Sequence, residues 1–191
     1  MLRKLGLIFI ASVSVLLGAC ASNHMTVIPP EQQTIAPEEG KALIHFMRPT
    51  SFGGAIQSTI YDGDEYIGTV SANTRVCYQS DPGSHMFMVV GESADFLQAE
   101  LLPNKTYYVN VQPRMGVWKA RFSFRPMNGQ VPKGDIDQWV KETKEVKINE
   151  QGRVWASKNK ESVKKLKEKY LPKWNEKSDT IKQVLKAESG I

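Results

Sequence analysis

Cysteine is scarce in this sequence. The 191 residues include two cysteines, Cys20 and Cys77, too few for the disulfide framework that stabilises many small secreted domains. Cys77 lies in a short strand-like run, residues 74–78. We interpret it as a small packed side chain rather than a reactive thiol. Without disulfides, the fold depends on a hydrophobic core.

Histidine is also rare, and its spacing suits no metal site. His24, His45 and His85 are far apart, and no two of them stand at the i, i+4 spacing that places two ligands on one helix face. A structural role is the simpler interpretation of each. The sequence therefore predicts no metal centre and no cofactor.

Catalytic signatures are missing as well. No serine stands in a Gly-x-Ser-x-Gly context, and the loop at Gly53 and Gly54 lacks the Gly-Lys-Ser/Thr ending of a phosphate-binding loop. We interpret this loop as a connection between strands. These absences predict no catalytic residues and make an enzyme the less favoured class.

The apolar run at residues 5–17 is shorter than the about 20 residues that a membrane-spanning helix needs. It follows two basic residues, Arg3 and Lys4, and precedes two small ones, Gly18 and Ala19. This order is typical of a secretory signal, which is removed from the mature protein. We therefore assign residues 1–19 to a signal peptide.

Leu17, Gly18 and Ala19 stand directly before Cys20. This sequence resembles a bacterial lipobox, in which the cysteine becomes the first mature residue and carries acyl chains. The resemblance implies that Cys20 is the lipidation site and that several acyl chains hold the protein stably on a membrane. Ala21, in place of an aspartate, implies the outer membrane of a Gram-negative envelope, on the side facing the periplasm. The alternative is an ordinary signal peptide with a stray cysteine.

The net charge of +5 overstates the basicity of the mature chain, because two basic residues leave with the signal. Most of the remaining positive excess lies in residues 150–191, and the preceding body is close to neutral. A protein anchored outside the cytoplasm does not meet nucleic acid in its ordinary location. We therefore predict no nucleic-acid partner.

Residues 20–39 contain prolines, glutamates and glutamines without an apolar period, and we interpret them as a flexible tether behind the lipidated cysteine. From residue 40 to 148, short strand-like runs alternate with turn signals such as Asp62-Gly63-Asp64. The sequence predicts a mainly β fold, an antiparallel β-sandwich with a C-terminal α-helical extension. Its expected strands are residues 42–48, 56–61, 65–70, 74–78, 84–90, 96–101, 106–112 and 118–125.

Two of these strands indicate where the core lies. In residues 118–125, aromatic and small apolar side chains alternate with charged or polar ones, so the aromatic face belongs in the core. In residues 86–90, both faces are apolar. That strand needs a cover on its second face, and the C-terminal segment is the candidate.

Residues 149–191 are expected to form a basic helical extension. Pro172 disfavours an uninterrupted helix, which predicts two helices or a kink. The apolar side of this extension packs on the sandwich, grips a partner or lies on an anionic membrane, and its large aromatic residues favour the first. The apolar period near 3.6 comprises Val163, Leu166, Tyr170, Trp174, Ile181 and Leu185.

A shorter helix and one ambiguous strand precede this extension. The helix is expected around Trp139, with Asp135 as its N-cap and Gln138 completing the capping-box spacing. The ambiguous strand is residues 145–148.

Four basic residues mark a candidate binding surface. Lys119, Arg121 and Arg125 lie on the polar face of the strand at residues 118–125, and Arg114 lies near its start. Such groups bind a carboxylate, a phosphate or an acidic polysaccharide. The alternative is an ordinary solvated sheet face, which antiparallel strands commonly show.

Turn and strand motifs recur at residues 40–49, 61–63, 67–68, 82–85 and 106–109. Together they resemble an uncharacterised family of bacterial lipoproteins with a domain of unknown function. Their rhythm is also similar to that of immunoglobulin-like and carboxypeptidase-regulatory-like sandwiches. The resemblance implies a fold for residues 40–126 and leaves the activity open.

These observations predict a lipid-anchored cell-envelope protein that acts as a non-catalytic binding or structural accessory. Its expected partners are the membrane, through the lipid anchor, and an envelope protein or acidic glycan. The alternative is an envelope hydrolase that acts on cell-wall or lipid material. A pocket joining His45 or His85 to a carboxylate would favour that alternative.

Replacing Cys20 by alanine tests the anchor. The variant Cys20→Ala lacks the sulfur that accepts the lipid, so we expect cells grown with labelled palmitate to leave it unlabelled. Continued labelling of the variant would contradict the assignment.

Overall fold

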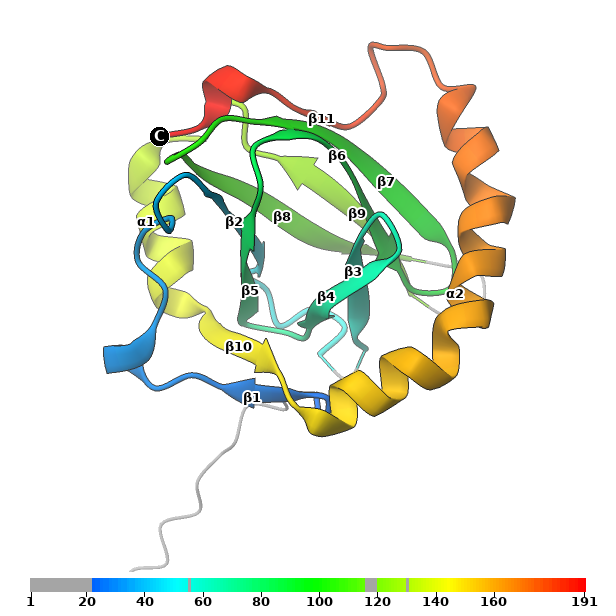
Figure 1. Cartoon of the computed structure of the whole chain (residues 1–191), viewed down its shortest axis with the longest axis horizontal. Coiled ribbons are helices and arrows are strands. Elements are labelled where there is room, and N and C mark those ends of the chain that lie inside the picture. Colours follow the sequence, from blue (N-terminus) through cyan, green and yellow to red (C-terminus); the bar gives the residue numbers. More distant parts are fainter. Residues whose placement is uncertain (1–21, 55, 116–119, 130) are drawn as a thin grey trace, which may run out of the picture.

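The computed structural model describes residues 22–54, 56–115, 120–129 and 131–191 of the chain, which form a mainly β fold with a long C-terminal helix (Figure 1). In chain order the strands and helices are β1 (Met25–Val27), the 3-10 helix η1 (Pro30–Gln32), β2 (Ala42–Arg48), β3 (Ser58–Asp62), β4 (Glu65–Val70), β5 (Thr74–Ser80), β6 (Gly83–Val90), β7 (Ala94–Leu101), β8 (Thr106–Arg114), β9 (Arg121–Pro126), α1 (Lys133–Glu142), β10 (Lys144–Ile148), α2 (Glu150–Asn175), β11 (Val184–Leu185) and η2 (Ala187–Ser189).

Within the described ranges, these strands form two sheets. One has the order β1-β10-β5-β2-β8-β9, and the other has the order β11-β7-β6-β3-β4. The prediction that all strands pair antiparallel is wrong. Three pairs are parallel: β2 with β8, β5 with β10, and β7 with β11. Parallel neighbours need a long connection between them. After β2, the chain supplies one by building most of the second sheet before it returns as β8.

The main core is shared by the two sheets. Ile44 and Phe46 of β2, Phe87 of β6, and Phe122 and Phe124 of β9 belong to one buried cluster. The alternation predicted for residues 118–125 is confirmed in part: Phe122 and Phe124 are buried and Arg121 and Arg125 are exposed, but Ser123, expected on the polar face, is also buried. Positions 118 and 119 lie outside the described residues.

Strand β6 has the two covers that its sequence requires. Phe87 and Val89 join the core between the sheets, whereas Met88 and Val90 belong to a second cluster with Trp174 of α2. Helix α2 crosses this outer face of the sheet (Figure 1). The prediction that the C-terminal segment covers this strand is therefore confirmed. Of the three alternatives given for the apolar side of the extension, helix α2 packs on the domain.

Of the two alternatives predicted for Pro172, two separate helices is wrong. One helix, α2, includes Pro172 in its last turn and ends at Asn175. Residues 176–191, all of which the structure describes, continue with β11 and η2. Leu185 leaves the helical period because the free edge of β7 accepts β11 and Leu185 becomes fully buried there. Edge pairing and burial override the local helical pattern.

Helix α1 forms around Trp139 as expected, but Asp135 is not its N-cap. The N-cap position is Pro132, and no side chain caps the helix there. Asp135 instead lies in the first turn, where a carboxylate interacts favourably with the helix dipole. Residues 145–148, the ambiguous segment, belong to β10.

The described part of the predicted tether is packed on the domain. Met25 is 5% exposed and lies in the main core, and β1 pairs with β10. Thr34 donates from both its backbone N–H and its hydroxyl to Glu145, at 2.8 Å each. The flexible-tether interpretation is therefore wrong for these residues. The sequence did not reveal their packing because their partners lie more than a hundred positions away in the chain, so the segment itself has no apolar period.

A buried ion pair joins this N-terminal segment to the six-stranded sheet. Arg75 Nη2 lies 3.7 Å from Glu145 Oε2, and both side chains are almost completely buried. Arg75 also donates to Gln33 Oε1 at 2.7 Å and to the backbone oxygens of Val140 and Thr143. These hydrogen bonds make the burial of both charges tolerable, although the Nε atom of Arg75 is buried without a partner among the described residues.

Substitution of Arg75 is expected to destabilise the fold strongly. Arg75→Leu leaves the Glu145 carboxylate buried without its countercharge, which costs about 3–5 kcal/mol. Urea denaturation measures the free energy of unfolding.

The matched control is Arg121→Leu. Arg121 pairs with Glu92 at 3.7 Å at the surface, and such pairs contribute less than about 1 kcal/mol. Equal losses in the two variants would contradict the role of the buried pair.

Candidate functional site

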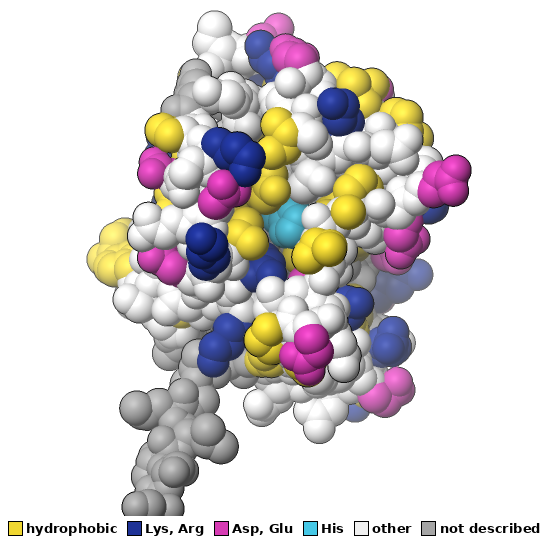
Figure 2. Space-filling model, turned by 90° about the vertical axis from the view of Figure 1, so that its left-hand side faces the viewer, with side chains coloured by type: hydrophobic (Ala, Val, Ile, Leu, Met, Phe, Trp, Pro, Cys, Tyr) yellow, Lys and Arg dark blue, Asp and Glu magenta, His cyan; other side chains and the backbone are white. Residues whose placement is uncertain are grey.

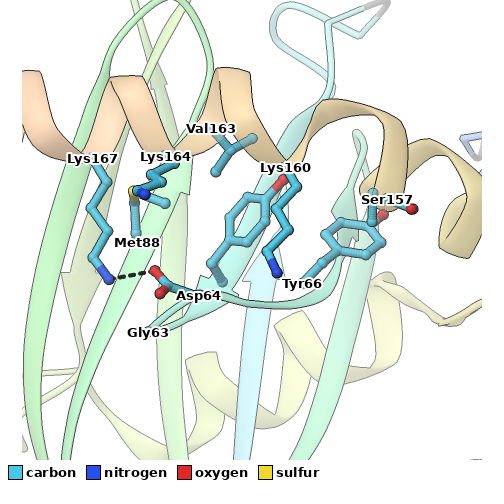
Figure 3. Close-up of a pocket in the computed structure, with 11 residues that line it drawn as sticks. Gly63, Asp64, Tyr66, Met88, Ser157, Lys160, Val163, Lys164 and Lys167 are labelled. Atoms are coloured by element: carbon cyan, nitrogen blue, oxygen red, sulfur yellow. Dashed lines mark hydrogen bonds and ion pairs between the residues drawn. The ribbon is translucent and has the colours of Figure 1, made fainter.

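A cleft lies between helix α2 and the β3–β4 hairpin, with a volume of about 230 Å³ (Figure 3). It is closed below by the outer face of the five-stranded sheet and on one side by the hairpin turn. The residues that line it are Tyr61, Gly63, Asp64, Tyr66, Met88, Ala156, Ser157, Lys160, Val163, Lys164 and Lys167.

The floor of the cleft is apolar with one polar exception. Tyr61 and Met88 are buried, and they belong to the cluster that packs against α2. The hydroxyl oxygen of Tyr61 is buried and has no hydrogen-bond partner among the described residues. Burial raises the pKa of Tyr61 to about 12, and the neighbouring Thr59 side chain partly offsets this rise.

Three lysines give the cleft its positive charge. Lys160, Lys164 and Lys167 follow one another at helical spacing on the same side of α2, and Figure 3 shows Lys160 and Lys167 extending toward the hairpin turn. Lys167 Nζ lies 2.6 Å from Asp64 Oδ1. This hydrogen bond and the positive charge of the three lysines hold the pKa of Asp64 below its usual value.

One carboxylate does not neutralise three ammonium groups. Among the described residues, Lys160 and Lys164 have no ion-pair partner within 4 Å. The cleft also continues along the helix into a second hollow of about 440 Å³, which shares Asp64, Lys164 and Lys167 and adds Leu171. Free cations above an apolar floor suit a ligand that joins an anionic group to an apolar body.

The predicted basic surface is only partly assembled. Arg114 and Arg121 are directly opposite each other on β8 and β9, and Arg125 is opposite Asn110. Lys119, like the predicted lipidation site Cys20, lies outside the described residues. Arg114, Arg121 and Arg125 do not line the cleft beside α2.

Arg125 instead lines a separate hollow of about 330 Å³ beneath α1, together with Asn110, Trp139 and Asp135. The nearby Asp135 carboxylate makes this hollow less positive than the cleft beside α2. It does not extend the row of basic residues that the sequence suggested.

His45 and Cys77 are brought together on the outer face of the six-stranded sheet. Cys77 Sγ lies 3.2 Å from His45 Nδ1, and the His45 ring stacks on Tyr108 with centroids 5.0 Å apart. Burial and the nearby Arg75 lower the pKa of His45 to about 4, and burial raises that of Cys77 to about 12. Both groups are neutral at pH 7, unlike the thiolate–imidazolium pair of a cysteine nucleophile.

The molecular face on the side of α1 and η1 contains a shallow depression in which a histidine is visible among hydrophobic side chains (Figure 2). Charged side chains of both signs are scattered around it rather than gathered on one side. This face therefore offers less charge selectivity than the cleft beside α2.

His85 has the partners of a serine–histidine–aspartate arrangement. Its Nδ1 lies 2.8 Å from Asp62 Oδ2, and its Nε2 lies 3.2 Å from Ser80 Oγ. However, Nε2 also lies 2.9 Å from the carbonyl oxygen of Asp81. A carbonyl oxygen only accepts hydrogen bonds, so it competes with Ser80 for Nε2, whereas the corresponding nitrogen of a catalytic triad contacts the serine alone. Ser80 is also 2% exposed, which leaves no room for a substrate.

The sequence contained signals for each wall of the cleft but not for the cleft itself. The Asp62-Gly63-Asp64 turn and the lysine period of α2 are both visible in the sequence. Their meeting depends on how α2 crosses the sheet, about a hundred residues later in the chain.

The described residues contain no group of three histidine, cysteine, aspartate or glutamate side chains arranged to hold a metal ion. Within the same part of the chain, no helix is long and apolar enough to cross a bilayer. Comparison with protein-family models, curated proteins and solved structures found no match. The resemblance to a lipoprotein family therefore stays a prediction.

The buried state of His45 predicts a dependence of stability on pH. Its pKa of about 4 in the folded protein lies below the value of 6.5 expected when the chain is unfolded. The unfolded chain therefore takes up the proton first, and stability falls as the pH is lowered from 6.5 to 4, by about 3 kcal/mol from this residue.

His45→Phe should remove this part of the loss while retaining an aromatic ring against Tyr108. Urea denaturation at several pH values compares it with the wild type and with the control Tyr108→Phe, which leaves His45 in place. Parallel profiles for wild type and His45→Phe would contradict the prediction.

Proposed function

We propose that this protein is a lipid-anchored, non-catalytic binding or structural accessory of the cell envelope, and that it binds an anionic ligand in the cleft beside α2. The lipobox-like sequence ending at Cys20 supports the anchor and a place on the periplasmic side of the outer membrane. The observation that carries the binding role is the excess of lysines over an apolar floor. The ligand class includes an acidic lipid, an acidic glycan or an acidic segment of an envelope protein.

The finer architecture that we propose is a β-sandwich covered by a helix on each side. The shared core supports it, because side chains from both sheets interdigitate there. Clusters on the outer faces support the two covers: Ile136 of α1 packs against Met47, and Trp174 of α2 packs against Phe96. A rigid body of this kind suits a binding site built on strands and a helix.

An envelope hydrolase acting on cell-wall or lipid material is the alternative, and one observation favours it. Ser80, His85 and Asp62 lie in hydrogen-bond contact. The Asp81 carbonyl on His85 Nε2 argues against a general base at that position, and neither Ser80 nor His85 lines the cleft beside α2. The contact is better explained as a clamp that holds the β5–β6 turn to the end of β3.

Dye binding tests the cleft. Anilinonaphthalenesulfonate combines a sulfonate with apolar rings, so we expect its fluorescence to rise on binding to the full chain. Lys164→Glu reverses a charge at the cleft and should weaken binding about tenfold, equivalent to about 1.4 kcal/mol.

Lys165→Glu is the matched control, because it makes the same change in net charge at an exposed neighbour that does not line the cleft. Equal weakening by both variants would contradict the site. Displacement of the dye by dodecanoate but not by polygalacturonate would identify the ligand as an acidic lipid rather than an acidic glycan.

A further inference from the structure

The N-terminal end of the described chain is held tightly against the domain. Ser22 is 3% exposed and its carbonyl accepts from Met25 N–H at 2.9 Å. The carbonyl of Asn23 accepts from the side chain of Asn149 at 3.0 Å. The carbonyl of His24 accepts from the backbone N–H of Asn149 at 3.2 Å. The chain is therefore fixed to the start of α2 from its first described residues.

The glycine at position 152 makes this close contact with α2 possible. A Cβ added to Gly152 would lie 2.3 Å from the His24 carbonyl oxygen, which is far inside van der Waals contact. Any larger residue would push the N-terminal segment away from the helix. The close contact therefore requires a glycine at position 152.

Two residue steps separate Cys20 from Ser22. An extended chain spans at most about 3.6 Å per residue, so the acylated cysteine lies within about 7 Å of the domain surface at Ser22. The headgroup layer on one side of a bilayer is of similar thickness, about 5–7 Å. A lipid on Cys20 therefore leaves no spacer, and the surface around Ser22 and the start of α2 meets the headgroups.

This surface has the composition of a membrane-contacting region. Val154 at the start of α2 is 43% exposed, and Val27 of β1 is 41% exposed. Trp155 stacks on His24 with ring centroids 5.1 Å apart. Val154, Trp155 and Lys158 line a surface hollow together with Glu150 and Gln151. Tryptophan suits the boundary between headgroups and acyl chains, and lysine is attracted to anionic lipids.

We propose that Val27, Val154, Trp155 and Lys158 form the surface on which the domain rests against the anionic membrane that carries its anchor. This inference rests on the lipid anchor of the proposed function. Figure 1 shows β1, which contains Val27, and the start of α2 at the same edge of the molecule.

The rest of α2 does not lie flat on the membrane. Its apolar side chains, including Leu166, Tyr170 and Trp174, pack against the sheet. The outward positions Glu161, Lys165, Glu168 and Lys169 are all charged. An interfacial helix needs an apolar face toward the lipid, and α2 has already used that face for packing. Only its first turns offer exposed apolar groups.

Site-specific labelling of the acylated full chain in vesicles tests this orientation. Val154→Cys and Ile181→Cys both replace exposed apolar residues, 43% and 64% exposed. About 30 Å of helix separates Val154 from the end of α2, beyond which Ile181 lies. Each variant carries a thiol-linked fluorophore, and the vesicles contain neutral and anionic phospholipids, a fraction of them with a quencher at the headgroup. Labelling of the wild-type protein measures how much fluorophore attaches to Cys77.

We expect loss of fluorescence at position 154 and none at position 181. An acylated protein that sediments with the vesicles but shows no loss at 154, or equal loss at both positions, overturns the orientation while leaving the anchor intact. A chain that incorporates no palmitate and does not sediment with vesicles overturns the anchor itself, and the orientation with it.

Discussion

The buried pair of Arg75 and Glu145 holds together parts of the chain that are far apart in sequence. Glu145 accepts from Thr34, and Arg75 donates to Gln33 and to the end of α1. An unpaired charge at this depth costs several kcal/mol. The N-terminal segment, β5, β10 and α1 are therefore held in one arrangement, which leaves the outer edge of β10 open to β1.

The position of α2 follows from this arrangement at one end and from a separate contact at the other. Its first turn is fixed by Asn149 and Gly152 against the N-terminal segment. Its last turn is fixed by Trp174, whose indole N–H donates to Gln183 at 2.9 Å. Between these two attachments the helix passes over the β3–β4 turn and leaves the cleft. The candidate ligand site and the proposed membrane-contacting surface are consequences of the same helix placement.

Hydrogen-bond context decides the chemistry of the polar residues more than their identity does. His85 has a serine and an aspartate as neighbours, but the backbone carbonyl of Asp81 competes with Ser80 for its second nitrogen. His45 and Cys77 are in contact, but burial keeps both neutral. By contrast, Lys160 and Lys164 are exposed and line the cleft, where a ligand reaches them.

Local patterns in the sequence determined strands β2 to β9, the α1 helix and the second cover of β6, because each depends on alternation, helical period or turn residues within a short window. Most strand boundaries lie within two residues of those expected from the sequence. The tertiary structure decided the parallel pairings, the packing of residues 22–36, the departure of Leu185 from the helix, and the cleft. Each of these depends on a contact between residues that are distant in the chain: a strand added at a sheet edge, a buried ion pair or a helix that crosses a sheet. Such contacts produce no periodic pattern within a short stretch of sequence.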